Sequence, residues 1–214
     1  GVSKYKGSGD PSALAETASP HMAELRRRVA WPSALAAPRL DHVEIVETNS
    51  AMDRLDSAVL GPIGVKLSYI HTATGRAYLA ACDPDERRAI INRIRPEDAE
   101  PASDAALDRI LMETRARGYS ERDPPHPWSD RNRSEVVTDG RRSIAVAITA
   151  HGHAIGALNM TWPGHRMPVK EVVAQHLGMI AGDHDGRALI LPGLLQPRDD
   201  AAELIIHLFD ESVI

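Results

Sequence analysis

The sequence predicts an α+β domain in which helices cover an antiparallel β-sheet. Two observations predict this fold. Two apolar segments, residues 143–150 and 154–162, flank a short turn that contains Gly152, which is the pattern of a β-hairpin. Several other segments carry apolar residues at every third or fourth position, the spacing of amphipathic helices. Antiparallel strands and helices in this mixture pack as an α+β fold.

The composition suits one protein with a sizeable buried core. The chain has 214 residues, of which 43% are hydrophobic. Its single cysteine, Cys82, cannot form an intramolecular disulfide, and no signal peptide or membrane-spanning run is evident, so we expect a cytoplasmic protein. With 25 basic and 30 acidic side chains the formal net charge is -5, which argues against a surface that binds nucleic acid directly.

The N-terminal third predicts a linker, a helix and a hairpin. Residues 1–10, GVSKYKGSGD, have no apolar period and predict a linker remnant. Apolar residues at helical spacing predict an amphipathic helix over residues 11–29. Residues 31–38 and 42–49 then predict two paired strands, separated by a turn.

Helices dominate the middle of the chain. The segment HTATGRAYLAA, residues 71–81, begins with small polar residues and continues with the composition of a buried helix. Its N-terminus either cradles an anion on unpaired backbone N–H groups or is the cap of a core helix. Residues 83–94 predict another helix that begins with an Asp-Pro pair, and a third runs from Ser103 to Gly118.

The remaining segments predict one long loop and further helices. Residues 120–140 are rich in proline and charge and predict a surface loop beside a site. A helix is predicted over residues 169–180, followed by a turn and a short apolar run over 182–193 and a helix over 199–209.

Catalytic and metal-binding motifs are weak. His151 and His153 lie at the predicted hairpin turn without carboxylate or cysteine ligands at a suitable spacing, so solvated turn residues are favoured over a metal site. The acidic cluster at residues 183–185 is likewise typical of a turn. No nucleophile elbow or phosphate loop occurs, and Cys82 lies in an apolar segment where its thiol stays protonated. Neither an enzyme, nor a cofactor, nor a bound metal is therefore expected.

Polar residues inside the second hairpin strand indicate a different kind of site. Asn159 and Thr161 alternate with apolar neighbours, so they share one sheet face, and Ser143 on the partner strand could share it. Two alternatives remain open. The face is exposed to water, or the helix that begins near Thr72 covers it and a bound ligand satisfies the buried polar groups.

Four ordered motifs, IHTATGRAYLA, ETRARGYS, GRRSIAVAI and IGALNMTWP, resemble the ligand-binding domain of the isocitrate lyase regulator (IclR) family of bacterial transcription regulators. The resemblance covers roughly Pro11 to Leu177. The details WPSALAAP, GRAYLA and LNMTW look most like the branch that controls the catabolism of phenylpropionate and related aromatic acids.

This resemblance implies a GAF-like antiparallel sheet flanked by helices, a small organic acid as effector, and a homodimer or homotetramer. It implies that residues 11–214 form the effector-binding domain. It also implies that DNA is bound only through an N-terminal winged helix-turn-helix, which we expect to be absent from this chain.

Carried over by motif, the family's effector contacts fall on the start of the helix predicted near Thr72 and on the predicted hairpin. Ala73, Thr74 and Gly75 at the helix start would hold a carboxylate on their backbone N–H groups. The resemblance places Val59 at the apolar end of the pocket. The hairpin contacts fall on three residues that the alternation also selects: Ser143, Asn159 and Thr161.

Two rival functions are a small-molecule enzyme on a GAF-like scaffold and a dimerisation module with a filled pocket. The enzyme predicts turnover of a candidate acid and a titratable base in the pocket. The dimerisation module predicts no response to any acid.

Overall fold

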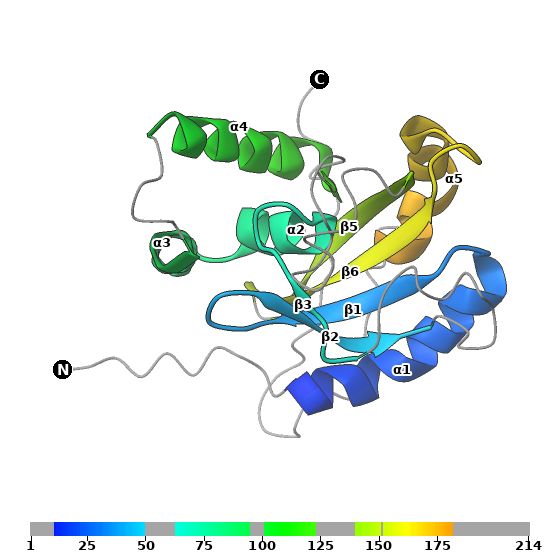
Figure 1. Ribbon diagram of the computed structural model, residues 1–214. Coiled ribbons are helices and arrows are strands. Elements are labelled where there is room, and N and C mark those ends of the chain that lie inside the picture. The colour runs from blue at the N-terminus through cyan, green and yellow to red at the C-terminus, as the bar shows by residue number, and fades with distance from the viewer. Residues whose placement is uncertain (1–10, 50–62, 95–100, 123–139, 151, 182–214) are drawn as a thin grey trace.

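The computed structural model describes residues 11–49, 63–94, 101–122, 140–150 and 152–181 (Figure 1). These residues form helices on both sides of one antiparallel sheet, as the sequence predicts. In chain order, the elements are α1 (Pro11–Arg28), β1 (Ser33–Pro38), β2 (Val43–Thr48), β3 (Lys66–Leu67), α2 (Ala73–Ala81), α3 (Pro84–Ile94), α4 (Pro101–Arg117), β4 (Ser120–Glu121), β5 (Arg141–Ala150), β6 (His153–Pro163) and α5 (Val169–Ala181).

The six described strands lie in the order β3-β2-β1-β6-β5-β4, and each neighbouring pair is antiparallel. Both predicted hairpins are confirmed. In the second, Ser143 lies opposite Thr161 and Ala145 opposite Asn159. The turn between β5 and β6 contains Gly152 with φ 77°, a left-handed conformation that favours glycine. Strand β1 pairs with β6, so the two hairpins join at the centre of the sheet.

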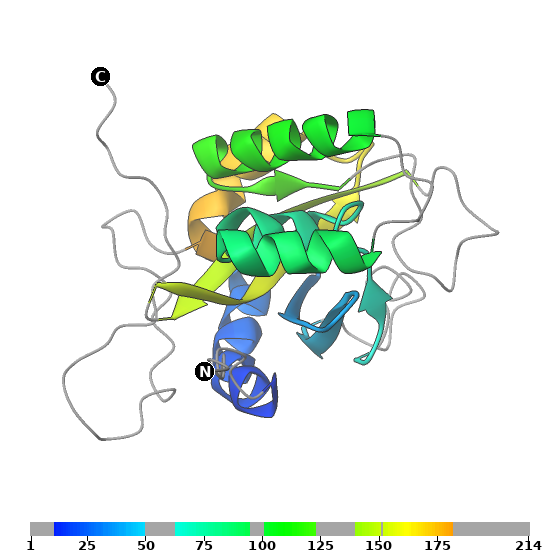
Figure 2. The ribbon, with the colours of Figure 1, turned by 90° about the vertical axis from the view of Figure 1, so that its left-hand side faces the viewer.

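Each face of the sheet is covered by helices. Helices α1 and α5 cover one face, whereas α2 covers the other and carries α4 on its outer side (Figures 1 and 2). The predicted α1 stripe is buried on the first of these faces: Leu14, Ala18, Met22, Leu25 and Val29 are all at most 7% exposed. A one-sided sheet facing water is therefore excluded for the central strands.

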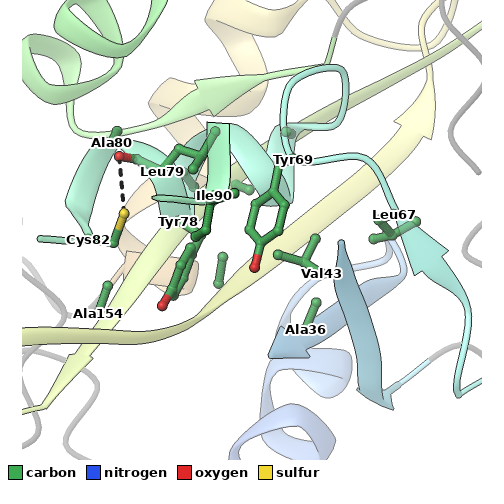
Figure 3. Packing of buried hydrophobic residues seen from close by; sticks show 14 of the residues in the cluster. Ala36, Val43, Leu67, Tyr69, Tyr78, Leu79, Ala80, Cys82, Ile90 and Ala154 are labelled. Carbon is green, nitrogen blue, oxygen red and sulfur yellow. Dashed lines mark hydrogen bonds between the residues drawn. The ribbon is translucent and has the colours of Figure 1, made fainter. Parts of the chain in front are cut away.

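Small side chains let α2 lie close to the sheet. The strand residues beneath it include Ala34, Ala36, Ala145 and Ala157, all buried. Tyr69 and Tyr78 fill the space at the side of the helix, and their ring centroids are 6.0 Å apart (Figure 3). An aromatic pair at this separation packs favourably beyond the area it buries.

Two short strands differ from the sequence predictions. Residues 120–140 were expected to form a surface loop, but Ser120–Glu121 form β4 and pair with β5. Lys66–Leu67 form β3 in a segment for which no strand was predicted. Two residues are too few to show an alternating pattern, so neither strand has a periodic signal in the sequence. Residues 123–139 of the expected loop, together with the segments predicted over 182–193 and 199–209, lie outside the described residues.

Candidate functional site beneath helix α2

The first turn of α2 is capped by its own chain. Thr72 is the N-cap, and its Oγ1 accepts a hydrogen bond of 3.0 Å from the Gly75 N–H. A Cβ at Gly75 would lie 2.4 Å from the Ser68 carbonyl oxygen and from the Tyr69 Cα. Glycine is therefore needed for close packing at this position, and its amide serves the cap. This corrects the expectation that the Gly75 N–H is available to hold a carboxylate.

Asn159 links α2 to the sheet. Its Nδ2 donates to Thr74 Oγ1 at 3.1 Å, and its Oδ1 accepts from the Ala34 N–H at 2.9 Å. Asn159 is 6% exposed and Thr74 is 1% exposed. Of the two alternatives left open by the alternation, the face exposed to water is excluded, because the helix start lies over the second hairpin strand. The bound ligand in the other alternative remains a prediction.

Ser143 and Thr161 form a second buried polar contact on the same face. Their hydroxyl oxygens are 2.6 Å apart across the β5–β6 pair, and either can be the donor. Both residues are less than 9% exposed. A buried hydroxyl pair of this kind retains further donor and acceptor capacity, because each hydroxyl has one proton and two lone pairs.

Strand β4 adds polar residues that the sequence interpretation missed. Ser120 Oγ contacts the Ala73 carbonyl oxygen at 2.5 Å and the Ala145 carbonyl oxygen at 3.2 Å, which fastens α2 to β5. The Arg122 N–H donates to the Ser143 carbonyl oxygen at 3.1 Å, and Arg122 is only 8% exposed. The one sequence signal near these residues was Gly118, which predicted the end of a helix. In the structure Gly118 has a left-handed φ of 75° and lies between α4 and β4.

Arg76 joins α2 to the same edge of the sheet. Its Nε donates to the Ile70 carbonyl oxygen at 2.7 Å, and its Nη1 donates to the Glu121 carbonyl oxygen at 3.0 Å. The guanidinium thus connects the turn before α2 with β4. The site is bounded by an anchored helix rather than by a loosely packed one.

Six of the seven predicted effector residues lie on this helix start and the sheet face beneath it. They are Ala73, Thr74, Gly75, Ser143, Asn159 and Thr161. Val59 lies outside the described residues. We refer to the space bounded by the first turn of α2, the end of β4, and the facing parts of β5 and β6 as the α2 site.

Two cavities lie away from the α2 site. A groove of about 320 Å³ runs between α3 and α4 and is lined by residues that include Arg87, Arg88 and Leu107. A cavity of about 20 Å³ lies between α1, the opposite face of the sheet and α5, and its lining includes Met22, Leu35 and Met179.

Nucleophilic and metal chemistry find little support in the described residues. Burial raises the pKa of the Cys82 thiol to about 12, so the nucleophilic thiolate is scarce at neutral pH. Within the described part of the chain, no three histidine, cysteine or acidic side chains gather as metal ligands. His153 is exposed, whereas His151 and residues 183–185 lie outside the described residues.

The family can be assigned from the sequence match. Residues 10–181 match the family of bacterial transcriptional regulators defined by the IclR C-terminal domain. The chain belongs to this family. The IclR-type domain accounts for the helix-covered antiparallel sheet and for the ordered motifs along it.

Solved structures similar to this IclR-type domain agree in fold. A protein from Rhodococcus sp. RHA1 described as a transcriptional regulator is 24% identical with a TM-score of 0.63, over 78% of this chain and 63% of that one. An IclR homologue from Microbacterium hydrocarbonoxydans, complexed with 4-hydroxybenzoate, is 22% identical with a TM-score of 0.60, over 80% and 67%. The inducer-binding domain of an Acinetobacter PobR double mutant, complexed with 3-hydroxybenzoic acid, is 18% identical with a TM-score of 0.59, over 78% and 93%.

These identities establish the fold alone. This chain spans less than two thirds of the Rhodococcus protein that it resembles. Among the described residues, no helix combines the length and the apolar character that a membrane span requires.

Proposed function

We propose that this IclR-type domain senses a small organic acid at the α2 site. The observation that carries the proposal is the Asn159 amide, which joins Thr74 on α2 to the Ala34 backbone beside the buried Ser143–Thr161 pair. Buried amide and hydroxyl groups of this kind fix the orientation of a ligand, and the apolar residues around them accept its body. Ala73 and Thr74 form the roof, Gly75 allows its close packing, and Val59 is proposed to line the apolar end.

An aromatic acid is the favoured effector. Two structures of the same fold hold hydroxybenzoates, 4-hydroxybenzoate in one and 3-hydroxybenzoic acid in the other. An aliphatic keto or hydroxy acid is the competing ligand class.

Effector binding is proposed to shift the population between two arrangements of a homodimer or homotetramer. A ligand shifts such an equilibrium only by the difference between its affinities for the two states. Because α2 is fastened to β4, β5 and β6, a ligand that alters its first turn would move the helix as a unit. Operator affinity would then change through a winged helix-turn-helix preceding residues 11–214, in a cytoplasmic, non-enzymatic regulator that needs no metal or cofactor.

Thermal unfolding with a panel of acids tests this function. The panel contains phenylpropionates, cinnamates, benzoates, pyruvate and glyoxylate. An acid at one hundred times its Kd should stabilise the domain by about 2.7 kcal/mol. A dimerisation module with a filled pocket predicts no shift with any compound, and an enzyme predicts that the acid is consumed during incubation.

Thr161→Val assigns the response to the α2 site. Valine keeps the shape of threonine but removes the hydroxyl that contacts Ser143, so the shift with the best acid should fall by more than half. Thr149→Val, near the other end of β5, is the matched control and should respond like the unmodified protein. An equal response in Thr161→Val and the unmodified protein would refute the assigned face.

A further inference from the structure

The negative charge of an acid effector needs a partner other than the Gly75 N–H, which already caps α2. The Gly75 N–H already bonds to Thr72, and the backbone of Ser68 and Tyr69 lies against Gly75. A carboxylate could use the Gly75 N–H only by displacing Thr72 from the cap. A carboxylate buried without a cationic partner or several hydrogen bonds is strongly destabilised.

Arg122 lies on the same face of the sheet as the buried hydroxyl pair. Ser120 points toward α2, since its Oγ contacts the Ala73 carbonyl oxygen, and side chains two positions apart along a strand share a face. The Arg122 N–H continues the β4–β5 ladder by bonding to the Ser143 carbonyl oxygen. Continuing the β4–β5 register by one residue beyond Glu121 places Arg122 opposite Ser143, which lies opposite Thr161 on β6, so the three residues form one row.

This row combines a cation with two hydroxyls. Directly opposed residues on neighbouring antiparallel strands have Cβ atoms about 5 Å apart, within reach of a guanidinium. A guanidinium presents parallel N–H groups that match the two oxygens of a carboxylate. Ser143 and Thr161 add hydroxyl groups next to it, and each of the three residues is less than 9% exposed.

We infer that Arg122 determines the charge specificity of the α2 site by holding the effector's carboxylate at the β4 end of the row. The inference rests on the proposed function, because it assigns the ligand's anionic group within the same site. Arg122 would thereby favour carboxylic acids over neutral molecules of the same shape.

Isothermal titration calorimetry with matched acids and amides tests this assignment. The probes are 4-hydroxybenzoate and 3-phenylpropionate, each compared with its primary amide. The unmodified protein should bind at least one acid about ten- to hundredfold more tightly than its amide, the factor expected from a charge-assisted hydrogen bond. Arg122→Gln should lose that preference, whereas Arg122→Lys should keep part of it.

Arg142→Gln is the matched control. Arg142 neighbours Ser143 on β5, is exposed, and lies on the alternate face, so its loss should leave the preference unchanged. If Arg122→Gln does not fold, as judged by circular dichroism, Arg122→Lys replaces it: the acid should bind more weakly to this variant than to the unmodified protein, and equal affinity would overturn the role of Arg122.

The outcomes separate the two proposals. An acid that binds with equal affinity to Arg122→Gln and to the unmodified protein, or an amide that binds as tightly as its acid, overturns the role of Arg122 and leaves the α2 site standing. Failure of both acids to bind the unmodified protein removes the aromatic-acid site and the role of Arg122 together.

Discussion

At the scale of single residues, the α2 site is a place where the chain satisfies its own polar groups. Asn159 bridges a backbone N–H on β1 and a hydroxyl on α2, and Ser143 contacts Thr161. The Asn159 contacts join the helix start to the sheet, and the Ser143–Thr161 contact joins β5 to β6. An effector would have to use the remaining hydrogen-bonding capacity of these groups or exchange bonds with them.

Asn159→Leu should therefore cost stability as well as effector binding. The substitution leaves the buried Ala34 N–H and Thr74 Oγ1 without this partner, and the free energy of unfolding should fall by about 1–3 kcal/mol. Asn92→Leu on α3 is the matched control, because Asn92 is exposed and its loss should change stability by less than about 0.5 kcal/mol. Urea unfolding measures both, and equal losses would contradict the bridging role.

Gly75→Ala tests the close approach of α2 to the preceding turn. The added methyl group would overlap backbone atoms that cannot rotate away, so we expect a loss of about 3 kcal/mol or an unfolded protein. Gly152→Ala provides the comparison: its Cβ would meet nothing within 4 Å, and only the left-handed φ of 77° penalises it, by about 1 kcal/mol. Thermal unfolding that ranks Gly152→Ala as the more damaging change would refute this packing.

At the scale of elements, the sequence was informative wherever a period was long enough to count. Helix α1 and the β5–β6 hairpin were predicted because their apolar patterns extend over eight residues or more. Strand β4 is two residues long, so Ser120 and Arg122 appeared to belong to a surface loop. The alternation on β6 selected Asn159 and Thr161. It could not show that α2 covers them, because that depends on how segments distant in the sequence pack together.

Helix α2 is also held at its C-terminal end. Arg87 Nη1 donates to the Leu79 carbonyl oxygen at 2.9 Å, which places a cation at the negative end of the helix. Arg87→Met should lower the free energy of unfolding by about 1 kcal/mol. Arg88→Met, which removes only an exposed pair with Asp85, should have little effect. Chemical unfolding in which the two variants behave alike would contradict this role of Arg87.

At the scale of the whole molecule, stability should decrease on mild acidification. Burial lowers the pKa of His176 on α5 below its ordinary value of 6.5, so the unfolded chain binds this proton more readily than the folded domain. The corresponding stability is complete above about pH 6.5 and is lost as pH falls from there toward the folded pKa. Asp41 and Glu44 also have lowered pKa values. Because they are carboxyl groups, the stability linked to them is lost only below about pH 4.5.

His176→Gln isolates the histidine contribution. Lowering the pH from 7.5 to 5.5 should reduce the free energy of unfolding less in the variant than in the unmodified domain, because glutamine cannot take up the proton. His165→Gln is a control outside the packed helix, at an exposed position after β6. An identical pH dependence in His176→Gln and the unmodified domain would rule out this source.

The central claim is that an organic acid binds between the first turn of α2 and the row formed by β4, β5 and β6. Backbone amide NMR spectra recorded during titration with 4-hydroxybenzoate test it most directly, because each residue reports separately. An acid bound at the α2 site should cause its largest shift changes at Thr74, Arg122, Ser143, Asn159 and Thr161. Shift changes confined to the groove between α3 and α4, or no changes at saturating acid, would contradict it.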